Sequence, residues 1–421
     1  LYMVELNPVN VRVCKKIFNM IDDKATPNIG THNFLTFKGF KGIDKFDVIM
    51  GNPPFNKGGV RSKNKETKKG TETIWPNFVN KSISYLNDNM YLLFINPASW
   101  ISLQSSISKT YLDNQIVSLR FYNYGRALNL FGDTAGKIPL TYYLLKKSKT
   151  KNDTLIYDNC LDKFIKFNIY KYNKVPTEII NIIKKMLDYT LLHGSLEEKY
   201  YNTKRASPEN IKNKKDKTHK FPLIGIDKGN IFISYYNINQ NRKSNKKLLF
   251  PNFSMGYPIL DTSGELYPKS NMMHIIEYEN SEKKLKQLQN IFYTDLIFYL
   301  INVLKTKQNF FNNQIFSIIP DITKMTKKED INDEDLIKLF KLDKEDIKCI
   351  EKYKENGEGR LSDSKIKEFK NWRLSDKPNK LQANEPVIPH QPKPKTSPAV
   401  SPPKKQVKSV CSKAHPQGPP C

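Results

Sequence analysis

With 421 residues the chain is too long for one small domain, and we expect two folded units, each able to bury a core. The formal net charge of +27 favours a polyanionic partner, nucleic acid first and an anionic membrane surface second, although a Lys-rich composition also accounts for such an excess. No apolar run reaches the about 20 residues needed to span a bilayer, and the N-terminus lacks the layout of a signal peptide.

Apolar runs alternate with helical patterns from residue 1 to about 150. A helix is expected after the first strand, with Asn7 as its cap and Pro8 at its first position, and another over Thr73–Asn87. The expected strands are Leu1–Leu6, Thr31–Phe37, Phe46–Met50, Met90–Pro97, Ile116–Tyr122 and Ile138–Lys147. Buried strands separated by helices imply an α/β domain over residues 1–150 with a mostly parallel sheet.

The pattern changes after residue 150. Residues 151–325 read as a second, α+β domain, and residues 326–375 as a helical extension in which Asp343 caps the second of two short helices. In the second domain we expect strands at Gly229–Tyr236, Lys247–Ser254 and Tyr257–Pro268 and one helix over Glu282–Leu304. Residues 376–421 are rich in Pro and Lys and poor in apolar residues, which predicts a disordered tail.

The chain shows no sign of a metal or disulfide scaffold. Its cysteines, Cys14, Cys160, Cys349, Cys411 and Cys421, form no CxxC pair, so neither a zinc site nor a disulfide framework is indicated. A reducing, intracellular compartment fits best: the cytoplasm, or the nucleus or a virus factory in a eukaryotic or viral system. The six histidines show no metal-ligand spacing, and no HExxH, P-loop or GxSxG motif occurs.

The stretch KFDVIMGNPPFNKGG, Lys45–Gly59, carries the strongest chemical signal. Pro53 keeps Asn52 out of the helical region and holds its own carbonyl rigid at the end of a strand. The Asn52 amide oxygen and a backbone carbonyl can accept both hydrogens of an exocyclic amine, and Phe55 can stack on a planar base. Such a base would have to be flipped out of a duplex. The alternative is an ordinary proline-rich turn.

Basic residues surround this motif. The loop that follows it carries Lys57, Arg61, Lys63, Lys65, Lys68 and Lys69, whose position suits phosphate contact. Tyr122, Tyr124 and Arg126 are expected in a loop after the fifth strand, where they could line a DNA cleft. Solvated surface residues are the alternative for both groups.

The sequence FDVIMGNPPF resembles the catalytic motif of S-adenosylmethionine-dependent N6-adenine DNA methyltransferases of restriction–modification systems. The resemblance implies a Rossmann-like sheet, a site formed by Asn52, Pro53, Pro54 and Phe55, and direct attack of adenine N6 on the cofactor methyl group. YMVELNP resembles the family's second motif, which implies that Glu5 binds the cofactor ribose hydroxyls and that Leu6 also lies at the cofactor. NIGTHNFLTF resembles the family's third motif, with Asn33 in place of the usual Asp and Phe34 after it. The resemblance implies that these residues contact the cofactor adenine.

The resemblance extends over Leu1–Tyr353, with a target-recognition region in the second domain, and it implies double-stranded DNA as partner. One departure is that no glycine-rich cofactor loop precedes Glu5, so a central first strand is missing. We expect an upstream segment or a separate chain to supply it. The leading hypothesis is a DNA adenine-N6 methyltransferase. The alternatives are a catalytically inactive DNA-binding homologue and an amino-methyltransferase acting on RNA or protein glutamine. No membrane partner is expected. A linked endonuclease is possible in such a family, but the sequence shows no convincing nuclease set of carboxylates and lysine.

Overall fold

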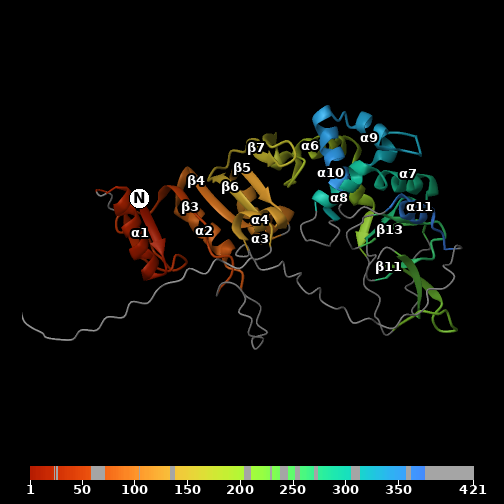
Figure 1. Ribbon diagram of the computed structural model, residues 1–421, viewed down its shortest axis with the longest axis horizontal. Coiled ribbons are helices and arrows are strands. Elements are labelled where there is room, and N and C mark those ends of the chain that lie inside the picture. The colour runs from red at the N-terminus through yellow and green to blue at the C-terminus, as the bar shows by residue number, and fades with distance from the viewer. Residues whose placement is uncertain are drawn as a thin grey trace, which may run out of the picture. The chain divides into compact units, whose positions relative to one another are not determined.

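The computed structural model describes most of residues 1–374 (Figure 1). The residues outside the description are 23, 25–26, 58–71, 104, 133–137, 203–209, 228–229, 238–244, 252–256, 270–273, 305–312, 357–361 and 375–421. All described residues belong to one compact unit, Leu1–Lys377, and the predicted tail lies outside them. Among the described helices, none is long and apolar enough to cross a bilayer.

The chain begins with a two-stranded parallel sheet, β1 (Tyr2–Glu5) and β2 (Asn28–Thr31), joined by α1 (Pro8–Ile21). The Asn7 side chain accepts a hydrogen bond from the backbone N–H of Val9 at 2.9 Å, so the predicted cap and the Pro8 start are confirmed. The strand predicted over Thr31–Phe37 is wrong, because the chain turns after Thr31. There the Asn33 side chain accepts from Leu35 N, a local bond that competes with strand pairing.

The next sheet has six strands in the order β3-β4-β6-β5-β7-β8 (Figure 1). They are β3 (Phe46–Gly51), β4 (Leu86–Pro97), β5 (Gln115–Tyr122), β6 (Leu140–Lys146), β7 (Thr154–Asp158) and β8 (Lys163–Phe167). β3–β4 and β5–β7 are parallel, while β4–β6, β5–β6 and β7–β8 are antiparallel. The protein is α/β, but this sheet is mixed rather than mostly parallel, because β6 lies between β4 and β5 and a β7–β8 hairpin forms its edge.

Helices and turns cover this sheet and close its core. They are α2 (Trp75–Tyr85), η1 (Ala98–Ser102), α3 (Ser106–Leu112) and α4 (Tyr124–Phe131). Trp75 and Trp100 are 3% and 0% exposed and belong to the main buried cluster. The loop predicted after the fifth strand is wrong, since α4 forms there; the Asn123 side chain caps it by accepting from Arg126 N at 3.0 Å.

The chain continues beyond residue 150 without leaving this sheet, because β7 and β8 belong to it. α5 (Ile169–Tyr172), α6 (Ile180–His193) and η3 (Leu196–Lys199) follow. Apolar residues of α6 share one buried cluster with the strands and with later helices. The predicted division into 1–150, 151–325 and 326–375 therefore has no counterpart in the strand pairing at residue 150, and it stays a prediction.

Two four-stranded sheets follow, in the orders β14-β13-β16-β9 and β10-β12-β11-β15. Their strands are β9 (Tyr200–Asn202), β10 (Ile211–Lys212), β11 (Phe221–Asp227), β12 (Asn230–Tyr236), β13 (Lys247–Phe250), β14 (Ile259–Asp261), β15 (Tyr267–Pro268) and β16 (His274–Glu277). Strands form within each of the three ranges predicted around residues 229–268: β12, then β13, then β14 and β15. Gly229 and the end of the second range, residues 252–254, lie outside the described residues. Gly264 adopts a left-handed φ of 74° in the turn before β15.

The single helix predicted over Glu282–Leu304 is wrong. It is divided into α7 (Glu282–Phe292) and α8 (Asp295–Val303), because the Thr294 side chain accepts from Ile297 N and starts a new helix. The short turns η5 (Asn313–Ser317) and η6 (Ile322–Lys324) follow. Nearly all of α8 is buried, as expected for a core helix.

The C-terminal described part consists of α9 (Asp333–Leu339), α10 (Lys344–Asn356) and α11 (Asp363–Asn371). Asp343 caps α10 by accepting from Asp346 N at 3.0 Å, as predicted. Cys160, after β7, and Cys349, in α10, form a disulfide across 189 residues. The expectation of no disulfide is therefore wrong: such a pair has no local spacing and depends on the folded chain to bring it together.

Candidate active site

The motif Asn52–Phe55 lies directly after β3, where β3 pairs in parallel with β4 through Gly51 and Phe94. Asn52 and Pro54 are exposed, Pro53 is buried and Phe55 is half-buried. The carboxyl end of parallel strands is where open α/β sheets place their ligands. The buried Pro53 thus anchors the motif while the Asn52 side chain remains accessible.

The backbone after the motif is held by the start of α2. The Phe55 carbonyl accepts from Ile74 N at 3.1 Å and from Trp75 N at 3.4 Å, and Lys57 N donates to the Glu72 carbonyl at 2.9 Å. The loop between these anchors lies outside the described residues, and with it the predicted phosphate contacts Arg61, Lys63, Lys65, Lys68 and Lys69. Lys57 is described and pairs with Glu72 at 3.5 Å; both side chains are highly exposed, so the pair contributes little.

The Phe55 ring is in contact with the small cluster formed around Ala127 and Leu140, to which Ile95 and Tyr122 also belong. The ring is thereby supported from α4 and β6. Its remaining exposed part is what a planar ligand could stack on. The role of Phe55 as a stacking platform stays a prediction.

The four predicted cofactor residues come together at one end of the two-stranded sheet. The register pairs Glu5 with Thr31, and His32 N donates to the Glu5 carbonyl at 3.0 Å, so the segments with Glu5–Leu6 and Asn33–Phe34 leave the same end of this sheet. One Glu5 carboxylate oxygen accepts from Asn7 N at 2.8 Å. The Asn33 amide oxygen is engaged by Leu35 N at 3.0 Å and has a second lone pair left to accept from an amine.

Helix α2 connects this group with the motif Asn52–Phe55. Its first residues hold the Phe55 carbonyl, and one turn later Phe78 stacks on Phe34 with ring centroids 5.6 Å apart and an interplanar angle of 10°. The loop with Asn33 and the loop with Asn52 are therefore both attached to one rigid helix. Helix α2 thus links the segment that carries the predicted cofactor residues Asn33 and Phe34 to the segment that carries Asn52.

Lys81 and Tyr85, on the same side of α2, were missed by sequence reasoning. The Lys81 ammonium donates to the carbonyls of Leu35 and Phe37 at 2.9 and 2.6 Å, and the Tyr85 hydroxyl donates to the Phe37 carbonyl at 2.6 Å. Burial lowers the pKa of Lys81. The spacing of Phe78, Lys81 and Tyr85 at i, i+3 and i+7 places them on one side of a helix, and this was the available sequence signal. It did not indicate the contacts of Lys81, because a lysine on a helix surface is ordinarily solvated.

A second Asn-Pro pair, Asn96-Pro97, ends the neighbouring strand β4 and differs from the first. Asn96 is fully buried, and its amide oxygen accepts from the hydroxyls of Tyr143 at 2.6 Å and Tyr111 at 3.3 Å. Tyr111 in turn stacks on Trp100 with centroids 4.1 Å apart. Asn96 thus serves the packing of the strand end, whereas only Asn52 is accessible to a ligand.

Arg126, predicted to contact DNA, lies on α4 and forms an ion pair with Glu178 at 2.5 Å. Glu178 is almost fully buried, and burial raises the pKa of its carboxyl group while Arg126 lowers it. The Arg126 side chain is about 40% exposed, and its guanidinium is engaged in this pair. In this structure Arg126 compensates the charge of a buried carboxylate. A phosphate contact by Arg126 stays a prediction.

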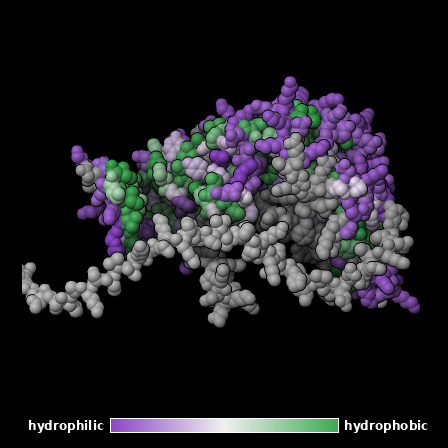
Figure 2. Space-filling model, viewed as in Figure 1, coloured by the Kyte–Doolittle hydropathy of each residue, from purple (hydrophilic) through white to green (hydrophobic). Residues whose placement is uncertain are grey.

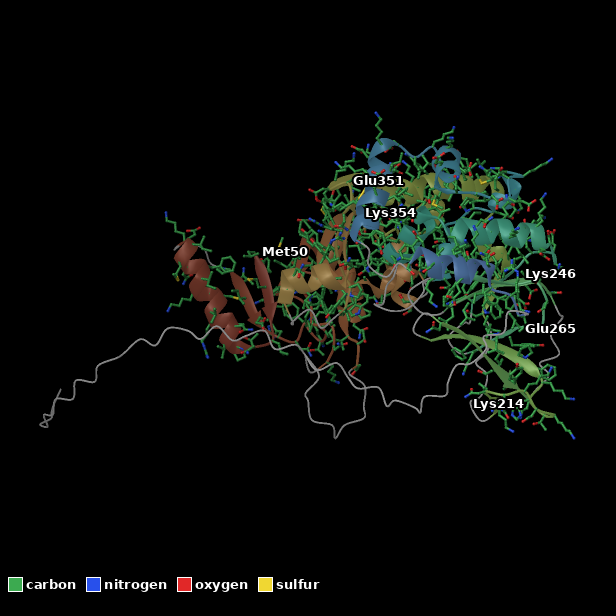
Figure 3. The ribbon with its side chains drawn as sticks, turned by 45° about the vertical axis from the view of Figure 1, so that its right-hand side comes forward. Met50, Lys214, Lys246, Glu265, Glu351 and Lys354 are labelled. Atoms are coloured by element: carbon green, nitrogen blue, oxygen red, sulfur yellow. A yellow bond between two sulfur atoms is a disulfide. The ribbon has the colours of Figure 1, made fainter. Side chains whose placement is uncertain are left out.

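β1 and β3 both have an edge without a strand partner among the described residues. The rings of Tyr2 and Phe46, at the starts of these strands, lie 5.8 Å apart, yet no strand pairing joins them. On β3, Val48 and Met50 are 53% and 69% exposed (Met50 is labelled in Figure 3).

Hydrophobic exposure is concentrated in this part of the chain. Ten of the sixteen exposed large hydrophobic residues of the described chain lie in residues 1–50, several of them on α1 (Figure 2). On α1 they are Val9, Val13, Ile17, Met20 and Ile21. Open strand edges and exposed apolar surfaces of this kind are places where another polypeptide segment can bind.

No group of three His, Cys, Asp or Glu side chains suited to a metal ion occurs among the residues that the structure describes.

Comparison with known proteins gives one family match. Residues 2–131 match the model of the Eco57I restriction-modification methylase family. This segment includes β1 to α4 and therefore all the candidate catalytic and cofactor residues. No curated protein matches the chain.

Several solved structures are similar to parts of the chain. A modification subunit of a putative type I restriction enzyme from Vibrio vulnificus YJ016 is 19% identical over 37% of this chain and 34% of its own, with a TM-score of 0.28. The M protein of the type I restriction enzyme EcoKI is 13% identical over 37% and 34%, with a TM-score of 0.26. The type IIG restriction endonuclease BpuSI is 9% identical over 88% and 58%, with a TM-score of 0.36.

TM-scores below 0.5 do not establish a common fold. The chain spans about a third of the length of the two type I subunits.

Proposed function

We propose that the protein is an S-adenosylmethionine-dependent DNA methyltransferase that modifies adenine N6. The observation that carries the proposal is the exposed Asn52 at the carboxyl end of β3, held by a buried Pro53 within the segment that matches a restriction-modification methylase family. An amide oxygen in this position can recognise an exocyclic amine without any covalent chemistry.

The chain's own residues would act by binding and orienting the base. The Asn52 amide oxygen and the Pro53 carbonyl accept the two hydrogens of the adenine amine, which draws its nitrogen lone pair out of the ring system. Phe55 stacks on the flipped base, a contact worth roughly 1–3 kcal/mol. Because the lone pair itself attacks, no residue has to remove a proton beforehand, and the proton on N6 leaves after transfer.

The cofactor would be held by Glu5, Leu6, Asn33 and Phe34. The available hydrogen-bond acceptors suit this part of S-adenosylmethionine. One Glu5 carboxylate oxygen has no hydrogen-bond partner in the described part of the chain and can accept from the ribose hydroxyls. The Asn33 amide oxygen keeps a lone pair that can accept from an adenine amine. When bound, the cofactor supplies an electrophilic methyl group. Nothing among the described residues corresponds to a loop around its methionine part.

We further propose that a polypeptide strand, from an upstream segment or a separate chain, pairs with the open edges of β1 and β3 and brings that loop. The exposed Val48 and Met50 and the apolar side of α1 support this, since they would be covered. Hydrogen exchange measured on the 421-residue chain and on a form that includes an upstream segment or a partner chain tests it.

In the present chain, the β3 amides not bonded to β4 should exchange within minutes, and in the completed protein at least about 100-fold more slowly. Amides of β5, which is paired on both sides, serve as the control and should be protected in both. Equal exchange of the β3 amides in the two samples contradicts the proposed strand.

The proposed partner is double-stranded DNA within the cell, read by the region after residue 150. Methyl transfer from labelled cofactor by the complete protein tests the function, with four acceptors: an adenine-containing duplex, poly(dG)·poly(dC), RNA and glutamine-containing protein. Transfer to the first alone is expected.

Label on poly(dG)·poly(dC) would point to cytosine N4, and label on RNA or protein would contradict a DNA substrate. Tight binding to DNA without cofactor binding would instead indicate an inactive DNA-binding homologue.

A further inference from the structure

A cluster of lysines lies in the turn between β10 and β11, away from the candidate active site in sequence. Lys212, Lys214, Lys215, Lys217 and Lys220 are all exposed, and Asp216 is the one carboxylate among residues 211–220. Five lysines and one aspartate give this short turn a net charge of +4. Lys214 lies at the end of these strands (Figure 3).

Asp216 organises the turn from within. One of its oxygens accepts from Thr218 N, the Thr218 hydroxyl and His219 N at 2.7–2.8 Å, and the other accepts from Lys212 at 2.8 Å. The Lys212 bond and these donors hold the pKa of Asp216 well below its usual range. The Asp216 carboxylate is therefore engaged in bonds within the turn, including the one to Lys212. These bonds fix the conformation of the turn.

The remaining lysines are available to a partner. Lys214, Lys215, Lys217 and Lys220 form no ion pair with any carboxylate in the described part of the chain. Unpaired, closely spaced ammonium groups on a preformed turn raise the local positive potential and attract an anionic surface.

The base of the turn is anchored. Ile211 and Phe221, at its two ends, both pair with Tyr236 of β12. Tyr236 is buried with Leu223, and Ile211, Phe221 and Tyr267 pack on them. The lysines thus project from a small, packed sheet, so that their spacing is kept when a ligand approaches.

The absence of exposed large apolar side chains from the described chain near the turn distinguishes between a membrane surface and a nucleic acid as its partner. A segment that binds at a membrane surface combines basic residues with exposed apolar ones that enter the lipid. Among the described residues after Leu192, no large hydrophobic side chain is exposed. A duplex, by contrast, offers one phosphate charge per about 1.7 Å of its axis and requires no apolar contact.

We propose that the turn Lys212–Lys220 binds the phosphate backbone of duplex DNA through Lys214, Lys215, Lys217 and Lys220. This inference rests on the proposed DNA function and adds a contact surface outside the segment that matches a methylase family. The turn contacts phosphate and so contributes affinity and register rather than base recognition.

The test is the salt dependence of duplex binding by the complete protein. The variant Lys214→Ala/Lys215→Ala/Lys217→Ala/Lys220→Ala is compared with a control that removes the same charge from α9 and α10, Lys338→Ala/Lys344→Ala/Lys348→Ala/Lys352→Ala. Each lost phosphate contact makes the slope of log K against log salt less steep by about 0.9. The turn variant should therefore reduce the magnitude of the slope by roughly two to four, and the reduction should be the same for duplexes of different sequence.

The control should leave the slope within about one of the unsubstituted protein, and the thermal unfolding midpoints should agree. A turn variant whose slope equals that of the control overturns the inference, as does a loss of binding to anionic vesicles with duplex binding unchanged. A protein that shows the expected slope change but transfers no methyl group contradicts the proposed function only. Absence of any duplex binding overturns both.

Discussion

Replacing Asn52 by alanine should lower the rate of methyl transfer to duplex DNA by at least about 100-fold. The substitution removes the side-chain acceptor that orients the target amine, and loss of one such preorganised hydrogen bond ordinarily costs 10²–10³ in kcat. The effect should appear in kcat rather than in KM for DNA, because phosphate contacts elsewhere provide most of the affinity. Single-turnover transfer of labelled methyl groups measures it.

Two further variants make this result specific. Asn52→Asp keeps an acceptor oxygen and should retain more activity than Asn52→Ala, whereas Asn371→Ala, an exposed asparagine in α11, should leave the rate unchanged. Asn52 is exposed, so its substitution should change the free energy of unfolding by no more than about 0.5 kcal/mol. Equal activity of Asn52→Ala and the unsubstituted protein would exclude Asn52 from the reaction.

Removing the disulfide by Cys160→Ser/Cys349→Ser should lower the free energy of unfolding of the oxidised protein by about 2–5 kcal/mol. The bond closes a loop of 189 residues, and in the chain-entropy description long loops restrict the unfolded state most. Urea unfolding of oxidised protein measures the difference. The unsubstituted protein in excess dithiothreitol should unfold like the double variant.

Cys14→Ser is the control, because Cys14 is a free cysteine, and it should have no such effect. Even without the disulfide, α10 stays attached to α6, since Lys185 pairs with the buried Asp346 at 2.5 Å. Reduction should therefore weaken the attachment without releasing the helix. This expectation is contradicted if dithiothreitol leaves the midpoint of urea unfolding unchanged. It is also contradicted if mass spectrometry finds the peptides with Cys160 and Cys349 unlinked.

Local signals account for the parts of the fold that could be predicted from the sequence. The caps at Asn7 and Asp343 and the strand before Asn52 depend on neighbouring residues, and each was correctly placed. The break between α7 and α8 was missed because the apolar pattern continues across it, and only the hydrogen bond of the Thr294 side chain shows a new start.

Long-range contacts account for most of what could not be predicted. The Cys160–Cys349 bond joins residues with no common motif, and Lys81 reaches carbonyls more than forty residues away. For the candidate site, the residue types of Asn52 and Glu5 indicated their chemistry. Their connection through α2 required the folded structure, because it consists of a ring stack and backbone hydrogen bonds that no spacing reveals.

The hairpin β7–β8 has a consequence for anyone who wishes to express the part with the candidate site as a separate fragment. A fragment ending near residue 150 would lose β7, expose the edge of β5 and remove Cys160 and Glu178, the partner of Arg126. Such an edge invites association with other chains. A fragment that keeps this sheet intact must therefore extend beyond β8 rather than stop at the change in sequence composition, because the hairpin belongs to the same sheet as β3, which leads into Asn52.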